Sequence, residues 1–111
     1  MKKLLFLFLM IFVSFFARAQ KIYSVEYSSQ ADIKVFVCKY ASQADLLVYK
    51  VKYQSQIGNN DGKWFFVEHA SQSEKKIFYV KYKSQADLII NFVDYSSKAK
   101  WLKNQKKHLL F

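Results

Sequence analysis

Most residues that could do chemistry lie in the last fourteen positions of the chain. Five lysines and one histidine alternate there with aromatic and aliphatic side chains, and no acidic residue intervenes. Ammonium groups interleaved with Trp and Leu are typical of segments that bind anionic lipid headgroups or polyanions. The candidate anion-binding residues are Lys100, Trp101, Lys103, Lys106 and Lys107. Alternatively, this tail (residues 98–111) packs as a last strand, with Trp101 and Leu109–Phe111 buried and the lysines in solvent.

Nucleophilic and metal-ligating residues are scarce elsewhere. The chain has one cysteine, Cys38, and two histidines, His69 and His108, and it contains no CxxC or HExxH motif. The serines lack a histidine and acid partner and a nucleophile elbow. We therefore expect no catalytic residue, no metal site and no cofactor. A hydrolase would need one of the two histidines beside an acid and a nucleophile in the folded chain.

A repeated unit positions all of these residues. A Tyr-x-Ser-Gln pattern recurs six times, with successive serines 13, 13, 16, 13 and 13 residues apart. The aligned serines are Ser29, Ser42, Ser55, Ser71, Ser84 and Ser97. Each unit has an apolar run rich in Val, Ile, Phe and Tyr with period-2 alternation, followed by a polar connector. The sequence thus predicts an all-β domain of six strand-plus-turn repeats, each with a strand of about eight residues and a turn of four or five.

The columns of the repeat suggest structural roles, each with a functional alternative. The tyrosine column either forms core or makes an exposed aromatic strip for glycans or flat ligands. The Ser-Gln pair is expected to close each turn by hydrogen bonds. Asp32, Asp45, Glu74 and Asp87 form an acid column, expected to be solvated; Ca²⁺ binding is the alternative.

Two single positions depart from their columns. Cys38 stands where five repeats have Val, so we expect a small buried side chain. His69 stands in the tyrosine column and is expected to be a structural ring at a strand position, with catalysis or metal binding as the alternative.

One insertion divides the repeats into two halves of three. It lies at Gly58–Gly62, which holds both glycines of the chain, and its Asn-Asp-Gly sequence predicts a tight turn. Two similar halves suit a chain that circles one axis twice, with its second lap between strands of the first. An ordinary meander or a short solenoid is the alternative.

These features together resemble the 7(1) septoil knot domain family. The resemblance covers about residues 21–111 and rests on the repeated Val-x-Tyr-x-Ser-Gln-Ala-Asp units, the central Asn-Asp-Gly and the ending Lys-Lys-His-Leu-Leu-Phe. It implies a small β-rich monomer wound into a deep torus knot, and no established biochemical activity. The departures are Ile57-Gly58 in the third repeat, Lys98-Ala99-Lys100 in the sixth, and His69.

The amino-terminal segment predicts export. Lys2 and Lys3 precede an apolar run from Leu4 to Ala17, and Ala17-Arg18-Ala19 is a small-x-small cleavage site. This layout is typical of a secretory signal peptide over residues 1–19, with an uncleaved anchor as the alternative. The mature domain would span residues 20–111 and lie in the periplasm or outside the cell.

Charge and export together narrow the partners. The 111-residue chain has 18 basic and 8 acidic residues, but most of the basic excess after the leader lies in the tail. No arginine remains after Arg18, which argues against nucleic-acid binding. We therefore predict a small exported, non-catalytic structural or binding module of unknown partner. The alternative is a module that binds lipid headgroups, lipopolysaccharide or acidic glycans through the tail.

Overall fold

The computed structural model describes residues 20–57 and 60–110. The predicted signal peptide, Gly58, Asn59 and Phe111 lie outside the described residues. The strands are β1 (Lys21–Ser24), β2 (Ile33–Val37), β3 (Leu46–Lys50), β4 (Lys63–Phe66), β5 (Lys75–Tyr79), β6 (Leu88–Phe92) and β7 (Lys100–Trp101).

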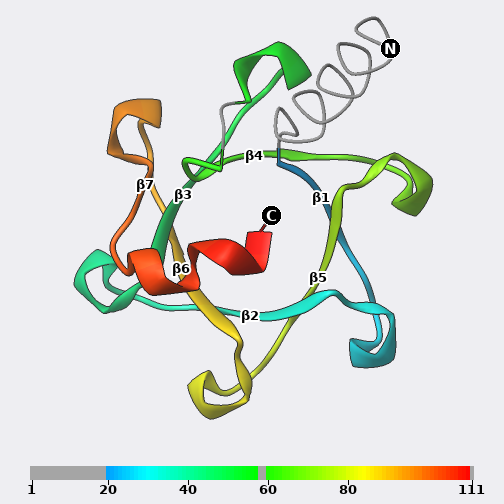
Figure 1. Ribbon diagram of the computed structural model, residues 1–111, viewed down its shortest axis with the longest axis horizontal. Coiled ribbons are helices and arrows are strands. Elements are labelled where there is room, and N and C mark those ends of the chain that lie inside the picture. Colours follow the sequence, from blue (N-terminus) through cyan, green and yellow to red (C-terminus); the bar gives the residue numbers. More distant parts are fainter. Residues whose placement is uncertain (1–19, 58–59, 111) are drawn as a thin grey trace, which may run out of the picture.

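The first six strands form a closed parallel barrel, in the order β1-β5-β2-β6-β3-β4, because β4 pairs with both β3 and β1 (Figure 1). Strands of the second half therefore lie between strands of the first half, and the chain passes around the barrel twice. β7 pairs antiparallel with the start of β3. The predicted all-β fold with two interleaved halves is confirmed, and the meander and the solenoid are excluded, since β3 and β4 are the sole consecutive strands of the barrel that pair.

Each repeat leaves the barrel wall earlier than the sequence predicts. Strands β1–β6 have four or five residues rather than about eight. The valine column still makes one more bond to a neighbouring strand; Val25 N–H, for example, donates to the Ile77 carbonyl at 2.8 Å. The chain then turns outward at the tyrosine column into a connector. Six connectors project from the barrel like spokes (Figure 1).

Every connector holds one turn of 3-10 helix just after the tyrosine column. The turns are η1 (Ser28–Gln30), η2 (Ala41–Gln43), η3 (Gln54–Gln56), η4 (Ala70–Gln72), η5 (Lys83–Gln85) and η6 (Ser96–Lys98). Main-chain bonds close them: Gln30 N–H donates to the Tyr27 carbonyl at 3.1 Å, and the other five repeat this bond. Among the side chains of the Ser-Gln column in the described range, hydrogen bonds are found at Gln56, whose Oε1 accepts from the N–H groups of Lys52 and Tyr53. The expected side-chain closure of every turn is therefore wrong.

Three acids of the acid column fasten one strand to the next. Asp32 N–H donates to the Lys76 carbonyl at 2.7 Å, and Asp32 Oδ2 accepts from the Lys76 N–H at 2.8 Å. Asp45 makes the same two bonds with Ile89, and Asp87 makes them with Lys34. We call this pairing the aspartate clasp. The expected exposure to solvent holds for Asp32 and Asp87 and is wrong for Asp45, which is buried. The unpredicted role of all three is structural, because a carboxylate can hold an N–H of a neighbouring parallel strand.

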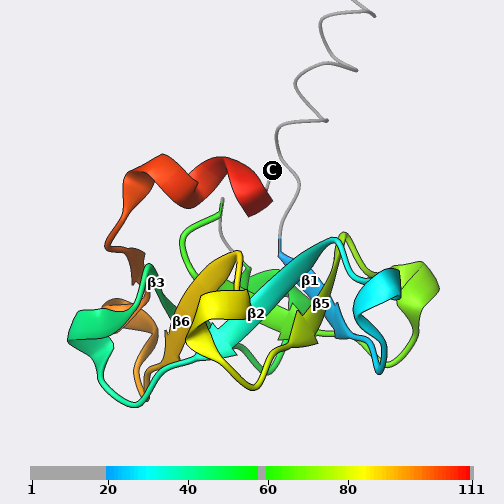
Figure 2. The same ribbon diagram turned by 90° about the horizontal axis from the view of Figure 1, so that it is seen from below.

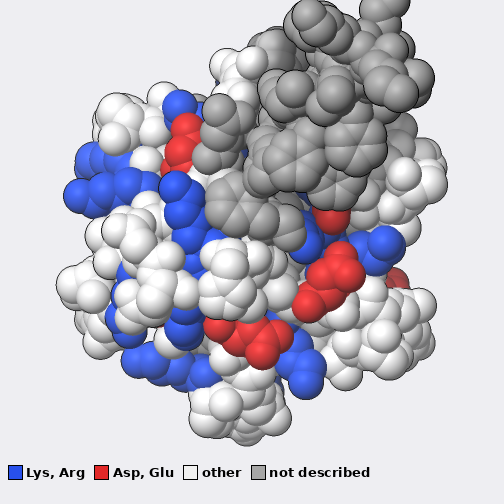
Figure 3. Space-filling view, viewed as in Figure 1, with Lys and Arg blue, Asp and Glu red and all other residues white. Residues whose placement is uncertain are grey.

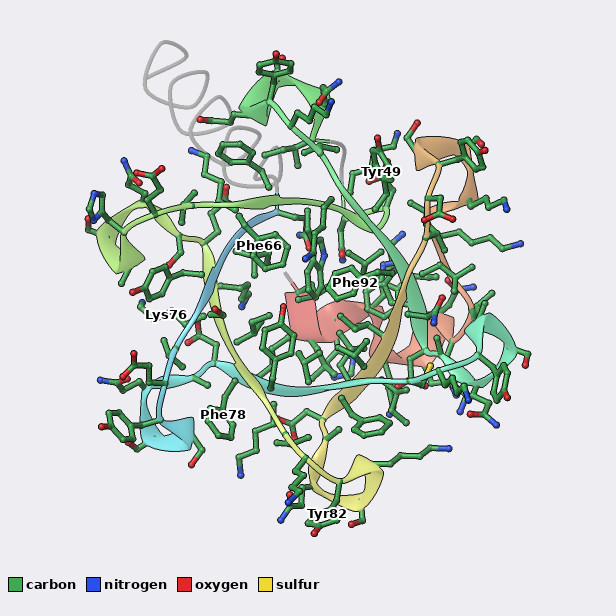
Figure 4. All side chains as sticks on the ribbon, turned by 180° about the vertical axis from the view of Figure 1, so that it is seen from behind. Tyr49, Phe66, Lys76, Phe78, Tyr82 and Phe92 are labelled. Carbon is green, nitrogen blue, oxygen red and sulfur yellow. The ribbon has the colours of Figure 1, made fainter. Side chains whose placement is uncertain are left out.

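Alternate strand residues fill the barrel. The interior holds Ile22, Ile33, Val35, Leu46, Val48, Trp64, Ile77, Leu88, Ile90 and Leu110, with Phe66, Phe92, Trp101 and Leu109 packed against them. Figure 4 shows the alternation: Phe66 and Phe92 point into the ring, whereas Tyr49, Lys76 and Phe78 point outward. A smaller cluster of Cys38, Ala44, Leu47 and Ile89 lies apart from this interior. Cys38 is buried and unpaired, as its column predicts.

The central loop is the tight turn that its sequence predicts. Asn60 has φ 54° and Gly62 has φ 92°, both in the left-handed region. A Cβ atom at Gly62 would collide with the main-chain oxygen of Leu47. Glycine is thus required both for the turn and for its close approach to β3.

The two ends of the barrel differ. The 3-10 helix η7 (Asn104–Leu110) lies across the amino ends of the strands (Figure 2) and places Leu110 in the interior. At the carboxyl ends, the Lys50 ammonium lies 5.2 Å from the Phe66 ring centroid and 4.4 Å from that of Phe92. The amino end is therefore covered by a separate segment of chain, and the carboxyl end is finished by residues of the strands themselves.

Candidate functional site

The tail, which carries the predicted anion-binding residues, is docked on the amino end of the barrel. Lys100 and Trp101 form β7 and pair with Leu47 and Leu46. The chain then turns into η7, where Leu110 is buried. The alternative, that the tail packs as a last strand, is therefore right for Trp101 and wrong for Leu109 and Leu110, which are helical.

Asp45 holds the start of this tail. Its main-chain oxygen accepts from the N–H groups of Leu102 and Lys103, at 2.9 and 3.0 Å. Its side chain is fully buried, with Lys106 Nζ 2.9 Å from Oδ2 and Lys103 Nζ 3.5 Å from Oδ1. Two of the five predicted anion-binding residues are thus already paired with a carboxylate of the same chain.

The surroundings of Asp45 keep it ionised. Burial alone would raise the pKa of this carboxyl, since a charge loses solvation in the interior. The Ile89 N–H and the two lysines outweigh that effect and lower the pKa below its ordinary value of 3.8. Sequence reasoning missed this role, because Asp45 occupies the same column as Asp32 and Asp87. The adjacent residues give no signal of its burial, since an alanine and an aliphatic residue flank all three aspartates.

Trp101 and the central loop anchor the rest of the tail. The Trp101 indole Nε1–H donates to the Asn60 carbonyl at 2.8 Å, and Asn60 Nδ2 donates to the Lys107 carbonyl at 3.0 Å. Gln20 Nε2 donates to the Leu110 carbonyl at 3.2 Å. The indole of Trp101 is therefore engaged within the protein.

Lys100 and Lys107 differ from the other predicted lysines. Lys100 is exposed and Lys107 is half-buried, and neither side chain has an acidic or hydrogen-bonding partner within residues 20–57 and 60–110. Figure 3 shows that lysines gather on the half of this face that carries β7 and η7. Among the five predicted residues, the free positive charge thus comes from these two.

The tyrosine column lies on the surface, and its assignment to the core is wrong. Its five tyrosines, each just before a connector helix, are 57–66% exposed; they are Tyr27, Tyr40, Tyr53, Tyr82 and Tyr95. Ile, Leu, Val and Trp64 of the strands fill the narrow interior of the six-stranded barrel, and the tyrosines lie beyond the strand ends. The connectors also point away from one another (Figure 1), so the tyrosines make a rim around the barrel rather than one strip.

His69 takes the tyrosine position before η4 and is exposed, so the expected strand position is wrong. It borders an open groove of about 810 Å³ between connectors η3 and η4. The groove is lined by Lys21, Lys52, Gln54, Phe65, Phe66, Val67, Glu68, His69, Ser71 and Gln72. The sequence signal for this groove was the departure from tyrosine at His69.

The remaining candidates for chemistry have structural surroundings. Cys38 Sγ–H donates to the Tyr40 carbonyl at 3.1 Å, and burial raises the pKa of its thiol. In the part of the chain that the structure describes, His, Cys, Asp and Glu side chains form no group of three that could hold a metal ion. In that same part no helix has the length and apolar character needed to cross a membrane.

Comparison with known proteins gives one match. A family model described as the 7(1) septoil knot domain matches residues 19–102, which cover both halves of the barrel and β7. No curated protein and no solved structure matches the chain. The matched region ends before Lys103, Lys106 and Lys107, so these three lysines lie beyond it.

Proposed function

Because the chain belongs to the 7(1) septoil knot domain family, we propose that it is a small exported module that binds a partner and catalyses no reaction. Export is inferred from the predicted signal peptide at residues 1–19, which would place the mature domain in the periplasm or outside the cell. The barrel supports a binding role, since its interior is filled by strand residues and η7. The connectors are left to present side chains to solvent.

The exposed tyrosines carry this proposal. Aromatic rings that are more than half exposed at repeated positions make poor core and good contact surface. Several have a lysine beside them: the ammonium lies 5.7 Å from the ring centroid for Lys39 and Tyr40, and 5.8 Å for Lys81 and Tyr82. Rings flanked by ammonium groups suit an anionic partner with flat faces, such as an acidic glycan.

The tail offers a second candidate surface. Lys100 and Lys107 have no partner among the described side chains, and together with Lys103 and Lys106 they surround the docked tail with positive charge. An anionic lipid surface or a polyanion would meet this charge on the η7 side of the barrel.

Binding of the mature domain to heparin and to vesicles containing phosphatidylglycerol tests both candidates. Two variants remove the same charge, Lys39→Gln/Lys81→Gln on the rim and Lys100→Gln/Lys107→Gln on the tail. We expect salt-sensitive heparin binding that the rim variant weakens at least fivefold. A larger loss in the tail variant would favour the second candidate. No binding of either probe at low salt would refute both.

A further inference from the structure

Residues that recur in all six repeats are explained by the barrel, whereas breaks in the pattern need another explanation. The third repeat is three residues longer than the others, and the fourth has His69 in place of tyrosine. The break at His69 lines a groove between the connectors η3 and η4. The insertion lies elsewhere, at the amino end of the barrel, where Asn60 bonds to Trp101 and Lys107.

The groove has an apolar floor and polar walls. Phe65 and Val67 of the β4 end are half-buried and supply an apolar floor on the outer face of the strand, opposite the inward Phe66. Gln54 on η3 and Gln72 on η4 line the groove from the two connectors. The volume of about 810 Å³ is in the range of small-molecule sites and would hold two or three sugar rings.

Its charge is positive. Lys21 and Lys52 line the groove against one acid, Glu68. Lys21 and Lys52 have no ion-pair partner among the described residues. Their ammonium groups are therefore available to a carboxylate from outside.

We infer that this groove binds an acidic sugar, such as a uronic acid unit of a polysaccharide. The apolar face of the sugar ring would lie on the phenylalanine floor. Its hydroxyl groups would bond to the amides of Gln54 and Gln72 and to the ring of His69. Its carboxylate would pair with Lys52 and Lys21. This inference rests on the proposed binding role and names a ligand and a site for it.

The neighbouring groove shows why the same ligand does not fit everywhere. It lies between connectors η1 and η4, has about 450 Å³, and is lined in part by Tyr23, Glu26, Tyr27 and Lys76. There one lysine, Lys76, stands against one acid, Glu26, whereas the η3–η4 groove has two lysines against Glu68. The smaller space and the balanced charge disfavour an anionic sugar in that groove.

The test is a titration of the ¹⁵N-labelled mature domain with trigalacturonate, and with neutral maltotriose as the control sugar. We expect shifts of amide signals in β4, η3 and η4 with trigalacturonate alone. Lys52→Gln and His69→Tyr should each raise the dissociation constant at least fivefold, since the first removes a cation and the second restores the repeat and narrows the groove.

A matched control lies on the fifth connector. Lys83→Gln on η5 removes the same charge at an exposed position outside the groove and outside the rim pairs of Lys39 and Lys81. It should leave trigalacturonate binding within twofold of the unmodified domain. All three positions are exposed, so the variants are expected to fold.

Three results would overturn the inference: no binding of trigalacturonate, equal binding of maltotriose, or equal losses in the Lys52→Gln and Lys83→Gln variants. The proposed function is tested separately by heparin. Heparin binding that Lys39→Gln/Lys81→Gln weakens, without any effect of trigalacturonate on the η3–η4 groove, would leave the rim proposal standing and refute the groove.

Discussion

The two ends of the barrel are built from different kinds of residue. At the carboxyl end, Lys50, Phe66 and Phe92 are the last residues of their strands and cover the interior from within the repeat. At the amino end, the interior is covered by η7, which is held by residues that precede strands, such as Gln20 and Asn60. The repeat thus closes the wall and one end, and the other end depends on residues that occur once in the chain.

The aspartate clasp shows the same contrast within one motif. Asp87 is exposed and bonds to Lys34 on the barrel wall. Asp45 makes the same bonds to Ile89, but the tail covers it and Lys103 and Lys106 approach its carboxylate. Asp87 therefore only joins two strands, whereas Asp45 also holds the tail against the barrel.

Removing both lysines at Asp45 should have the largest effect. In the Lys103→Gln/Lys106→Gln variant a buried carboxylate would be left without its cations, and we expect the free energy of unfolding to fall by about 3–5 kcal/mol. Urea denaturation at pH 7 measures this change. Lys100→Gln/Lys107→Gln is the control, with the same loss of charge and an expected change within about 0.5 kcal/mol. Equal losses in the two variants would show that stability depends on the net charge of the tail and not on its pairing with Asp45.

Removing the carboxylate of the aspartate clasp should cost more stability at Asp45, which the tail covers, than at the exposed Asp87. Asp45→Ala deletes a buried carboxylate that bonds to Ile89 N–H and Lys106, so we expect a loss of about 2–3 kcal/mol in the free energy of unfolding. Asp87→Ala deletes an exposed copy, where water can replace the bond, and should cost about 1 kcal/mol or less. If the two losses proved equal in parallel urea titrations, covering by the tail would add nothing to the clasp.

Acid should weaken the tail end through Asp45. The pKa of Asp45 in the folded protein is lower than its ordinary value of 3.8, so its ionised form stabilises the fold. This contribution is fully present above pH 3.8 and is lost as the pH falls through the lowered value. Unfolding free energy measured between pH 2 and 6 should therefore drop less in Asp45→Asn than in the unmodified domain. Parallel curves would contradict a lowered pKa at this carboxyl.

The smallest effect is expected at the carboxyl end. Lys50→Gln removes an exposed ammonium from the Phe66 and Phe92 rings, which should cost about 0.5–1 kcal/mol. Thermal unfolding compared with Lys34→Gln, whose ammonium has no partner among the described residues, isolates the contribution of the rings. A loss as large as that of the Lys103→Gln/Lys106→Gln variant would mean that the charged group of Lys50 stabilises the carboxyl end as strongly as the Asp45 ion pairs stabilise the amino end.

The strands and the central turn could be predicted from the sequence, because the same pattern of residues recurs in six repeats. Val at one column and alternating apolar residues before it placed the strands, and Asn60 and Gly62 marked the central turn. The tyrosine column was assigned wrongly because an apolar residue at a fixed position looks the same whether it packs inward or stands at a turn. Barrel diameter decides between these cases, and it is set by strand pairing rather than by any single repeat.

The tail could not be predicted in the same way. Its lysines looked like a free basic surface because the acid that two of them meet, Asp45, is 61 residues away from Lys106. The groove beside His69 was hidden for a similar reason, since it joins two connectors across β4. The Asp45 contacts and the groove beside His69 both form between different repeats. The residue pattern along the chain does not show which repeats lie next to each other in space.

The interleaved order of the strands also constrains how the chain folds. β1 pairs with β4 and β5, and β2 pairs with β5 and β6, so residues 20–57 contain no strand pair of their own. The clasps likewise join residues 44 or 53 positions apart. Folding must therefore begin with a large loss of chain entropy and proceed slowly, as for folds of high contact order. A chain that emerges from its amino end would have no sheet to form until β4, the first strand of its second lap, has followed.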